Sequence, residues 1–585
     1  MAPNQHVSRL HHHLSSNHIR LLRLNPSTDT PELGSLEVVD LDDAPPYYAL
    51  KVIVNGHELV LGIDLVACAR RLSLLSVTNT ELDPPVEYVW IDSIFALMRC
   101  IYRNSVKTLI WLGHDRAASA AAWRLLHRIY NVFREQNLAA VDPSNIPIRT
   151  FSQSAHDSSG LPAWDDDAWA HLRRVMELRW FSRIWVVQEV ALSRQDPVIL
   201  HGAHRYPWSR FGWAVAWLRR NGYMRLPQIP EQLRNVDTMA NIHRARTPWP
   251  LDALMSITQV KFHASDQRDK VYGLGLAAEC QDASNVPDEL RPDYSVKVTD
   301  LYQKVVYLLL RLGGSPAVLT RARGVMGSAT RRQREYDLDL ASWCPDWSDF
   351  KVFNEGISTS LSWIHYGDMS KPARLGFPNH YATSSGLDLQ LEPQHDTSSL
   401  QLRGSRLTRA LGDAESDRHF DVQMARILDE ALSLLPGNIW LSWAEKFIKA
   451  TTAEQHYLVG RGWDQSLRDG LAYLHKLLAD DAVTVSLSAL QMDRKKVMEL
   501  RIVRNFGFER ALPIISDGRM GMGPSSTRQG DVVSVLAGGG VPYCIRREGD
   551  HWLFVGESYV EGLMGGTATQ VSGQGLLAEE IFHFK

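Results

Sequence analysis

The stretch from Trp180 to Glu189 combines residue types that can do acid-base chemistry with residue types that build a core. On a helix, Trp185 and Glu189 are four positions apart and therefore share one face. A carboxylate beside an apolar wall is disfavoured in its charged form, which suits general acid-base or nucleophilic work. The alternative is a buried helix on which Glu189 pairs with Arg179 or Arg183. The pattern alone leaves both interpretations open.

Two further groups of charged residues are candidates for a site. Asp92 follows the apolar run that begins at Tyr88, and open α/β sheets bind ligands at the carboxyl ends of their strands. With Ser93 next to it, Asp92 could instead cap a helix or form a turn. The run Asp266, Arg268, Asp269 and Lys270 could bind a ligand, but alternating signs at a helix start are typical of an exposed, ion-paired face.

Other catalytic motifs are missing from the sequence. It contains no nucleophile motif such as GxSxG, no metal-binding spacing of His and Cys, and no glycine-rich phosphate loop. Its five cysteines are scattered singly, which indicates neither a zinc site nor a disulfide framework. We therefore expect no metal and no resident cofactor.

Composition places the chain among globular proteins of several domains. Of its 585 residues, 44% are hydrophobic and 22% are charged, and the formal net charge of −3 gives no basic surface for nucleic acid. No apolar run is long enough to span a membrane, and nothing resembles a secretion signal. We expect a cytoplasmic protein with no nucleic-acid partner and no membrane span.

The periodicity predicts an α/β fold in the N-terminal part. Residues 1–18, which are rich in histidine, read as a disordered leader rather than a metal site. Short strands are expected at 19–24 and 36–41, then a hairpin of 50–54 with 58–61 around Asn55 and Gly56, then a helix at 64–75.

Strands at 88–94 and 108–112 enclose a helix at 96–102, which is the order that a parallel sheet flanked by helices produces. Helices follow at 117–136 and 166–178, with a long loop between them at 141–162 that could carry function or be a tolerated insertion.

The rest of the chain changes character three times. Residues 206–330 read as an α-helical middle region, 331–425 as a linker and irregular region, and 426–500 as a helical segment. Residues 501–585 read as a small β-rich module, with strands near 532–536, 542–546 and 552–556 between glycine-rich turns.

Several blocks, in order, resemble the fungal heterokaryon-incompatibility (HET) domain and the regions that follow it. The family's central blocks resemble residues 88–94 and 101–113, and its third block resembles 180–189. Later matches are 264–274, 292–295, 342–348 and 530–564. The resemblance identifies residues 19–205 as a HET domain.

The stretch from Ser182 to Glu189 is also similar to the Ser-x-x-Trp-x-x-x-Glu stretch of Toll/interleukin-1 receptor (TIR) domains. This implies a TIR-like, flavodoxin-like parallel sheet. It also implies that Glu189 could cleave NAD, stabilising the positive charge that develops as nicotinamide leaves. In that case NAD is a substrate, Trp185 and Ser182 support the helix, and the chain is an NAD glycohydrolase.

Two signature blocks of the HET family are absent. The Ser-Tyr-x-Trp-Gly run is missing after Leu50, and the Cys-Ile-Asn-Gln run with its charged stretch is missing after Ile94. Loss of two loops would make the copy degenerate and inactive. The alternative is that coding sequence was taken for an intron, so that the natural protein contains both blocks.

The resemblance implies self/non-self recognition after cell fusion, ending in programmed cell death. Two mechanisms of different class stay open: signalling through self-association or an unknown protein partner, and NAD depletion through Glu189.

Overall fold

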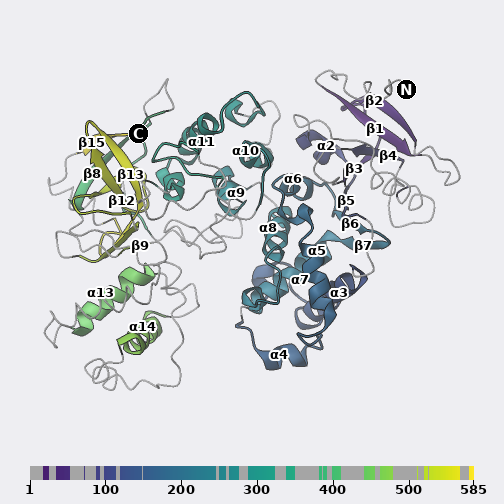
Figure 1. The fold of residues 1–585 in the computed structure, drawn as a ribbon, viewed down its shortest axis with the longest axis horizontal. Coiled ribbons are helices and arrows are strands. Elements are labelled where there is room, and N and C mark those ends of the chain that lie inside the picture. Colours follow the sequence, from purple (N-terminus) through teal and green to yellow (C-terminus); the bar gives the residue numbers. More distant parts are fainter. Residues whose placement is uncertain are drawn as a thin grey trace, which may run out of the picture. The chain divides into compact units, whose positions relative to one another are not determined.

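The computed structural model of the chain divides into two compact units. Unit 1 comprises Met1–Pro248 and Lys261–Pro292, and unit 2 comprises Trp249–Val260 and Asp293–Lys585. The structure describes residues 17–24, 34–52, 72, 87–91, 98–113, 119–147, 149–245, 249–258, 262–275, 287–322, 324, 338–348, 381–384, 387–391, 398–409, 440–454, 462–478, 510–511, 519–524, 526–566 and 579–585 (Figure 1).

Unit 1 is built on a seven-stranded sheet with the order β2-β1-β4-β3-β5-β6-β7. The central pairs β4 with β3, β3 with β5 and β5 with β6 are parallel, whereas β1 pairs antiparallel with β2 and β4, and β6 with β7. The predicted parallel sheet is therefore confirmed, with antiparallel strands added at both edges. The strands are β1 (His18–Leu24), β2 (Gly34–Asp40), β3 (Tyr47–Val52), β4 (Tyr88–Ile91), β5 (Thr108–Trp111), β6 (Val198–His201) and β7 (His204–Pro207).

The four parallel strands follow one another in space as second, first, third and fourth along the chain. This is the strand order of flavodoxin-like sheets, which bind ligands outside the carboxyl ends of the strands where the order reverses. In unit 1 that point lies between β3 and β5. The likeness to TIR domains itself stays a prediction.

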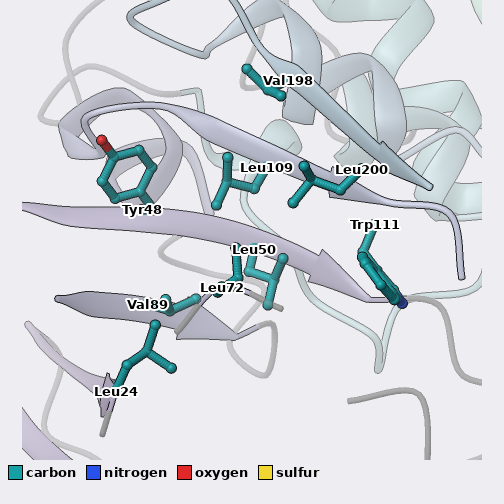
Figure 2. Packing of buried hydrophobic residues seen from close by; sticks show 9 residues of the cluster. All are labelled: Leu24, Tyr48, Leu50, Leu72, Val89, Leu109, Trp111, Val198 and Leu200. Atoms are coloured by element: carbon teal, nitrogen blue, oxygen red, sulfur yellow. The ribbon is translucent and has the colours of Figure 1, made fainter. Parts of the chain in front are cut away.

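A cluster of buried apolar side chains lies against the parallel strands (Figure 2). Strands β5 and β6 are buried at every position, as expected of parallel strands covered on both faces. This pattern explains why both strands read as continuous apolar runs rather than as alternating ones. The cluster consists of Leu24, Tyr48, Leu50, Leu72, Val89, Leu109, Trp111, Val198 and Leu200.

Amphipathic helices form the rest of unit 1. Helix α3 packs against α5 and α7, and α7 packs against α8. In α3 the buried Trp123, Leu126, Ile129 and Phe133 recur at helical spacing, so one apolar stripe faces its neighbours. The helices outside the candidate site are α2 (Met98–Asn104), α3 (Ser119–Gln136), η3 (Pro143–Asn145), α4 (Gln153–Ser158), α5 (Asp167–Met176), α7 (Trp208–Arg220), η5 (Tyr223–Arg225), α8 (Leu233–Arg244) and η7 (Asp288–Leu290).

The predicted loop at 141–162 is wrong, because it contains η3 and α4. Ser152 caps α4 by accepting a hydrogen bond from the backbone N–H of Ala155. The buried ring of His156 stacks on Trp164 at 4.3 Å between centroids, and its Nε2 lies 3.0 Å from the carbonyl oxygen of Pro162. The segment is thus tied down by packing that its polar composition conceals.

Unit 2 contains a closed barrel with the strand order β11-β12-β13-β15-β8. The predicted C-terminal β-rich module is therefore confirmed. A second sheet of three strands has the order β14-β10-β9. The bounds are β8 (Leu400–Arg409), β9 (Arg510–Ala511), β10 (Gly521–Pro524), β11 (Val532–Leu536), β12 (Tyr543–Glu548), β13 (His551–Glu557), β14 (Tyr559–Val560) and β15 (Glu579–Phe584).

Strand β8 lies in the region that was expected to be irregular. It pairs with both β11 and β15 and so closes the barrel. A Cβ at Gly404 would lie 2.3 Å from the carbonyl oxygen of Val535, so the close approach of the two strands requires glycine. Because glycine is uncommon inside strands, this residue helps to explain why the strand was not predicted.

Residues 342–348, in the same region, are also packed. Trp343 contacts Tyr307 at 5.7 Å and Trp347 contacts Tyr302 at 5.0 Å between ring centroids. Both tyrosines lie on α11 (Val298–Gly313). The hydroxyl of Ser342 accepts a hydrogen bond from the backbone N–H of Phe554 at 2.9 Å. This block therefore joins α11 to the barrel.

The remaining helices of unit 2 lie within the segments where helices were expected. In the pair α13 and α14, a Cβ at Gly470 would lie 2.6 Å from Ile448, so a glycine permits the close contact. The helices are α9 (Leu251–Thr258), α11 (Val298–Gly313), η8 (Pro316–Arg321), α13 (Trp440–Thr452) and α14 (Trp463–Leu478).

Several predictions fall outside the described residues. They are the leader before Asn17, the hairpin around Asn55 and Gly56, most of the helix at 64–75, and Asp92. Within the described part, Cys100, Cys344 and Cys544 are free thiols. No described helix is long and apolar enough to cross a bilayer.

Candidate functional site

Glu189 lies on the short helix α6 (Val186–Ala191) and is completely buried, with 0% of its surface exposed. Its Oε2 accepts a hydrogen bond of 2.9 Å from the indole Nε1–H of Trp180. Trp180 belongs to η4 (Arg179–Ser182), the turn that precedes α6, and is itself buried. A tight turn thus brings an indole donor back to a carboxylate nine residues later.

Trp185 makes a different contact from the one that the spacing suggested. It is the residue before α6, and its Nε1–H donates to Oδ2 of Asp269 at 2.9 Å in a buried hydrogen bond. The indole that donates to Glu189 is therefore that of Trp180, whereas Trp185 joins α6 to a segment 84 residues further along the chain.

Ser182 has a local role in the described structure. Its hydroxyl donates to the carbonyl oxygen of Arg179 at 3.1 Å, within η4. The chain beside it forms a parallel β-bridge between Arg183 and His263, in which the backbone N–H of Ile184 donates to the carbonyl of His263 at 2.9 Å. Ser182 therefore lies where η4 meets the 262–275 segment.

The segment 262–275 carries α10 (Asp269–Gly275) and packs against α6. Gln188 donates from its side-chain nitrogen to the carbonyl oxygen of Tyr272 at 3.1 Å. A Cβ at Gly273 would lie 3.2 Å from Ile184, so the glycine allows α10 to approach closely. Helix α6 is therefore held on one side by η4 and on another by α10.

The charged run at 266–270 is only partly the exposed face that we expected. Asp266 and Arg268 form an ion pair of 2.6 Å, and the hydrogen bond from Arg268 holds the pKa of Asp266 below its usual range. Asp269 and Lys270, however, are buried. Asp269 accepts from Trp185, and the ammonium of Lys270 donates to the carbonyl oxygen of Phe262. Burying these charges is tolerable because each has a hydrogen-bond partner.

The chain that follows α6 reaches the amino end of β5. Ser193, four residues later, accepts a hydrogen bond of 3.1 Å from the backbone N–H of Thr108, the first residue of β5. Open α/β sheets bind ligands at the opposite, carboxyl edge. Asp92 directly follows β4 in the sequence, but lies outside the described residues.

The hydrogen bonds of Glu189 and Asp269 connect segments of the protein to one another. Each of two indole N–H groups donates to one oxygen of a buried carboxylate. Among the described residues no group of three or more His, Cys, Asp or Glu side chains could hold a metal ion. Sequence reasoning missed both real pairs. Trp180 carries no spacing signal, and Asp269 is too far along the chain for any local pattern to reveal.

Comparison with known proteins agrees with this architecture. The family model for heterokaryon incompatibility protein (HET) matches residues 73–189, and the model for the Het-6 beta-barrel domain matches residues 495–574. The chain thus contains a region that matches the HET domain, followed by a region that matches the Het-6 β-barrel domain.

The chain is similar to the protein named heterokaryon incompatibility protein 6, OR allele, of Neurospora crassa. The two are 22% identical over 670 aligned positions, which cover 94% of each chain. Because 670 positions exceed the 585 residues of this chain, the relative contains stretches that this chain lacks. No solved structure matches the chain.

The structure extends both matched domains. The HET match ends at residue 189, whereas Trp185 and Gln188 within it are held by Asp269 and Tyr272 beyond it. The barrel match ends at residue 574, whereas the closed barrel also needs β8 and β15. Each folded unit is therefore larger than the sequence family that marks it.

Replacing Trp185 by Phe should destabilise unit 1. The change removes the N–H that satisfies the buried Asp269 carboxylate, at a cost of about 1–3 kcal/mol. Denaturant unfolding of the full chain measures this as an earlier transition of unit 1. The matched control is Trp164→Phe, because that indole donates to Gln153 in an exposed hydrogen bond. Equal losses from both variants would show that the Asp269 contact contributes nothing specific.

Proposed function

We propose that this chain acts in fungal heterokaryon incompatibility, recognising non-self after cell fusion and triggering programmed cell death. The HET domain supplies the death signal, and unit 2 with its barrel regulates that signal. The two domain matches in the same order, and the relative aligned over 94% of both chains, support the role.

The observation that carries the mechanism is the complete burial of Glu189 beneath the Trp180 indole. A carboxylate that stabilises a developing charge on NAD must touch the ribose. In this structure the carboxylate is 0% exposed, and one of its oxygens is occupied by a protein donor. The geometry thus favours a HET domain that signals through contacts with another copy or another protein.

The alternative is NAD cleavage by Glu189. It is supported by the presence of a glutamate in apolar surroundings within the matched domain, an arrangement that enzymes use to tune carboxylates. Reaching Glu189 would require η4 and α6 to separate, because Trp180 lies against it. NAD would then be a substrate, with no resident cofactor.

The absent blocks after Leu50 and Ile94 support a third reading, an inactive copy. Leu50 lies inside β3, the central strand that pairs with both β4 and β5. A block inserted directly after Leu50 would therefore interrupt this strand. Sequencing the native transcript across both joins separates a genuine loss from an unrecognised intron. Recovery of the blocks would make the chain an ordinary family member.

Expression of the chain in fungal cells tests the proposal. We expect growth arrest and loss of viability when the full chain is produced, and normal growth when residues 73–189 are deleted. NAD content measured before viability falls should stay at the level of the control cells. No effect of the full chain on viability, at confirmed expression, would contradict the proposed role, and an early fall in NAD would favour the enzymatic alternative.

A further inference from the structure

Among the described strands, β2 forms one edge of the unit 1 sheet, and it exposes two large apolar side chains. Leu36 is 50% exposed and Val38 is 54% exposed. Both lie on the sheet face of Leu22 and Leu24, because Leu22 pairs with Leu36, and Val38 lies opposite Arg20. Leu24 belongs to the core cluster and Leu22 packs against it, so Leu36 extends this apolar face outward from Leu22.

An edge strand of this kind is a template for pairing with another strand. Proteins usually protect exposed edges with lysine, proline or a bulge. Strand β2 contains neither lysine nor proline, its charged residues are Glu37 and Asp40, and its register with β1 is unbroken from Gly34 to Asp40. Its outer edge is therefore regular enough to accept a further strand.

We propose that β2 pairs antiparallel with β2 of a second copy of this chain, about a two-fold axis at Leu36. The inference deepens the proposed function and rests on it, because it gives the signalling domain a surface for self-association. A two-fold axis makes the interface isologous, so one strand supplies both sides.

The sequence of β2 selects this register. Directly opposite residues share a sheet face, so the axis must lie at a residue that pairs with itself. An axis at Glu37 places two carboxylates opposite each other, and an axis at Val38 places Leu36 opposite Asp40. An axis at Leu36 pairs the two Leu36 side chains, and sets Glu37 opposite Ser35 and Val38 opposite Gly34 of the second copy.

Charge complementarity supports the same register. On β1, Arg23 pairs with Ser35, and its guanidinium lies 3.1 Å from Glu87 and 3.9 Å from Glu37 of its own chain. In the proposed dimer the small Ser35 separates Arg23 from Glu37 of the second copy, so the long side chain can extend across it. Both partners are accessible, with side chains 52% and 36% exposed. The two-fold axis repeats the contact and gives two reciprocal ion pairs.

Disulfide trapping tests the register in the full chain. The Leu36→Cys variant should form a covalent dimer under mild oxidation, because directly opposite Cβ atoms lie about 4.5–5.5 Å apart and a small strand movement brings them to the roughly 3.5–4.5 Å of a disulfide. Val38→Cys, which faces Gly34, should form far less, and the wild type with its own cysteines sets the background. Leu138→Cys, at a residue 72% exposed in the same unit, is the control for random collision. Equal trapping at positions 36 and 138 would overturn the proposal.

A mixing experiment separates contacts between copies from contacts within one chain. Arg23→Glu and Glu37→Arg should each weaken self-association by about tenfold, since each places like charges across the interface twice. Mixed together, the two variants should associate like the wild type, because opposite charges then face each other between chains. Within each chain the pair stays broken, so failure of the mixture to associate would exclude the interface.

The outcomes for interface and function are distinguishable. If dimers are trapped but the chain does not kill cells, the interface is supported and the proposed function is excluded. Cell death that persists in both single charge variants, with no trapping at position 36, would remove the interface alone.

Discussion

Deleting residues 579–585 is expected to abolish cooperative folding of unit 2. The deletion removes β15, which pairs with β8 from Glu579 to Phe584 and lies beside β13 in the closed barrel. It also removes two fully buried aromatic side chains, Phe582 and Phe584, each worth about 3–5 kcal/mol when truncated to alanine. The opened barrel would expose the unpaired edges of β8 and β13.

Denaturant unfolding of the full chain, followed by tryptophan fluorescence and circular dichroism, measures this effect. We expect the transition of unit 2 to disappear while that of unit 1 remains. Phe582→Ala gives a milder test, with a loss of about 3–5 kcal/mol. The matched control on the same strand is His583→Ala, because that side chain is exposed. Native-like unfolding of the truncated chain would show that β15 is not needed for the barrel.

Replacing Asp531 by Ala should lower the free energy of unfolding of unit 2 by about 3–5 kcal/mol. The Asp531 side chain is 3% exposed and the Arg546 side chain 15%, and Nε and Nη2 of Arg546 reach the two carboxylate oxygens at 2.8 Å each. The carboxylate also accepts from the backbone N–H of Arg528 at 2.8 Å. Without it the partly buried guanidinium of Arg546 keeps its desolvation cost but loses its ionic partner.

The comparison variant is Glu580→Ala, which breaks the ion pair with Arg406 at the barrel surface. The Arg406 side chain is 50% exposed, so loss of the ion pair should lower the free energy of unfolding by no more than about 1 kcal/mol. The double variant Asp531→Leu with Arg546→Met should recover much of the loss, since apolar replacement of a buried pair is often neutral. A small effect of Asp531→Ala, similar to that of Glu580→Ala, would contradict the structural role of this pair.

The central architecture could be predicted from sequence because it rests on local patterns. The apolar runs that begin at Tyr88 and Thr108, with a helix between them, specify parallel strands, and the structure confirms this order. The strand Val532–Leu536 was predicted with the bounds that the structure shows. Periodicity indicates which residues of a segment are buried, and the strands Thr108–Trp111 and Val532–Leu536 are buried at every position.

The missed elements depend on partners that are distant in the sequence. Strand β8 reads as irregular because it carries Gly404 and several charged residues, yet it closes the barrel by pairing with strands more than a hundred residues further on. At the site, the helical spacing of Trp185 and Glu189 is real, but the indole of Trp185 is directed to Asp269 instead. Tertiary contacts of this length leave no periodic signal.

The measurement that tests the account most directly is the activity of Glu189→Gln in fungal cells. Glutamine has nearly the shape of glutamate and keeps an oxygen that can accept from Trp180, but it carries no charge. If Glu189 is a structural tie, we expect this variant to fold and kill like the wild type. Glu189→Ala, which leaves the indole N–H without its acceptor, should lose about 1–3 kcal/mol of stability in unit 1.

If Glu189 cleaves NAD, the missing charge abolishes both NAD loss and cell death while the fold is retained. Viability, cellular NAD and the unfolding transition of unit 1 should therefore be measured together for the wild type and both variants. Retained killing by Glu189→Gln at normal NAD levels is the result that the account predicts. A folded Glu189→Gln variant that no longer kills, beside a wild type that depletes NAD, would contradict it.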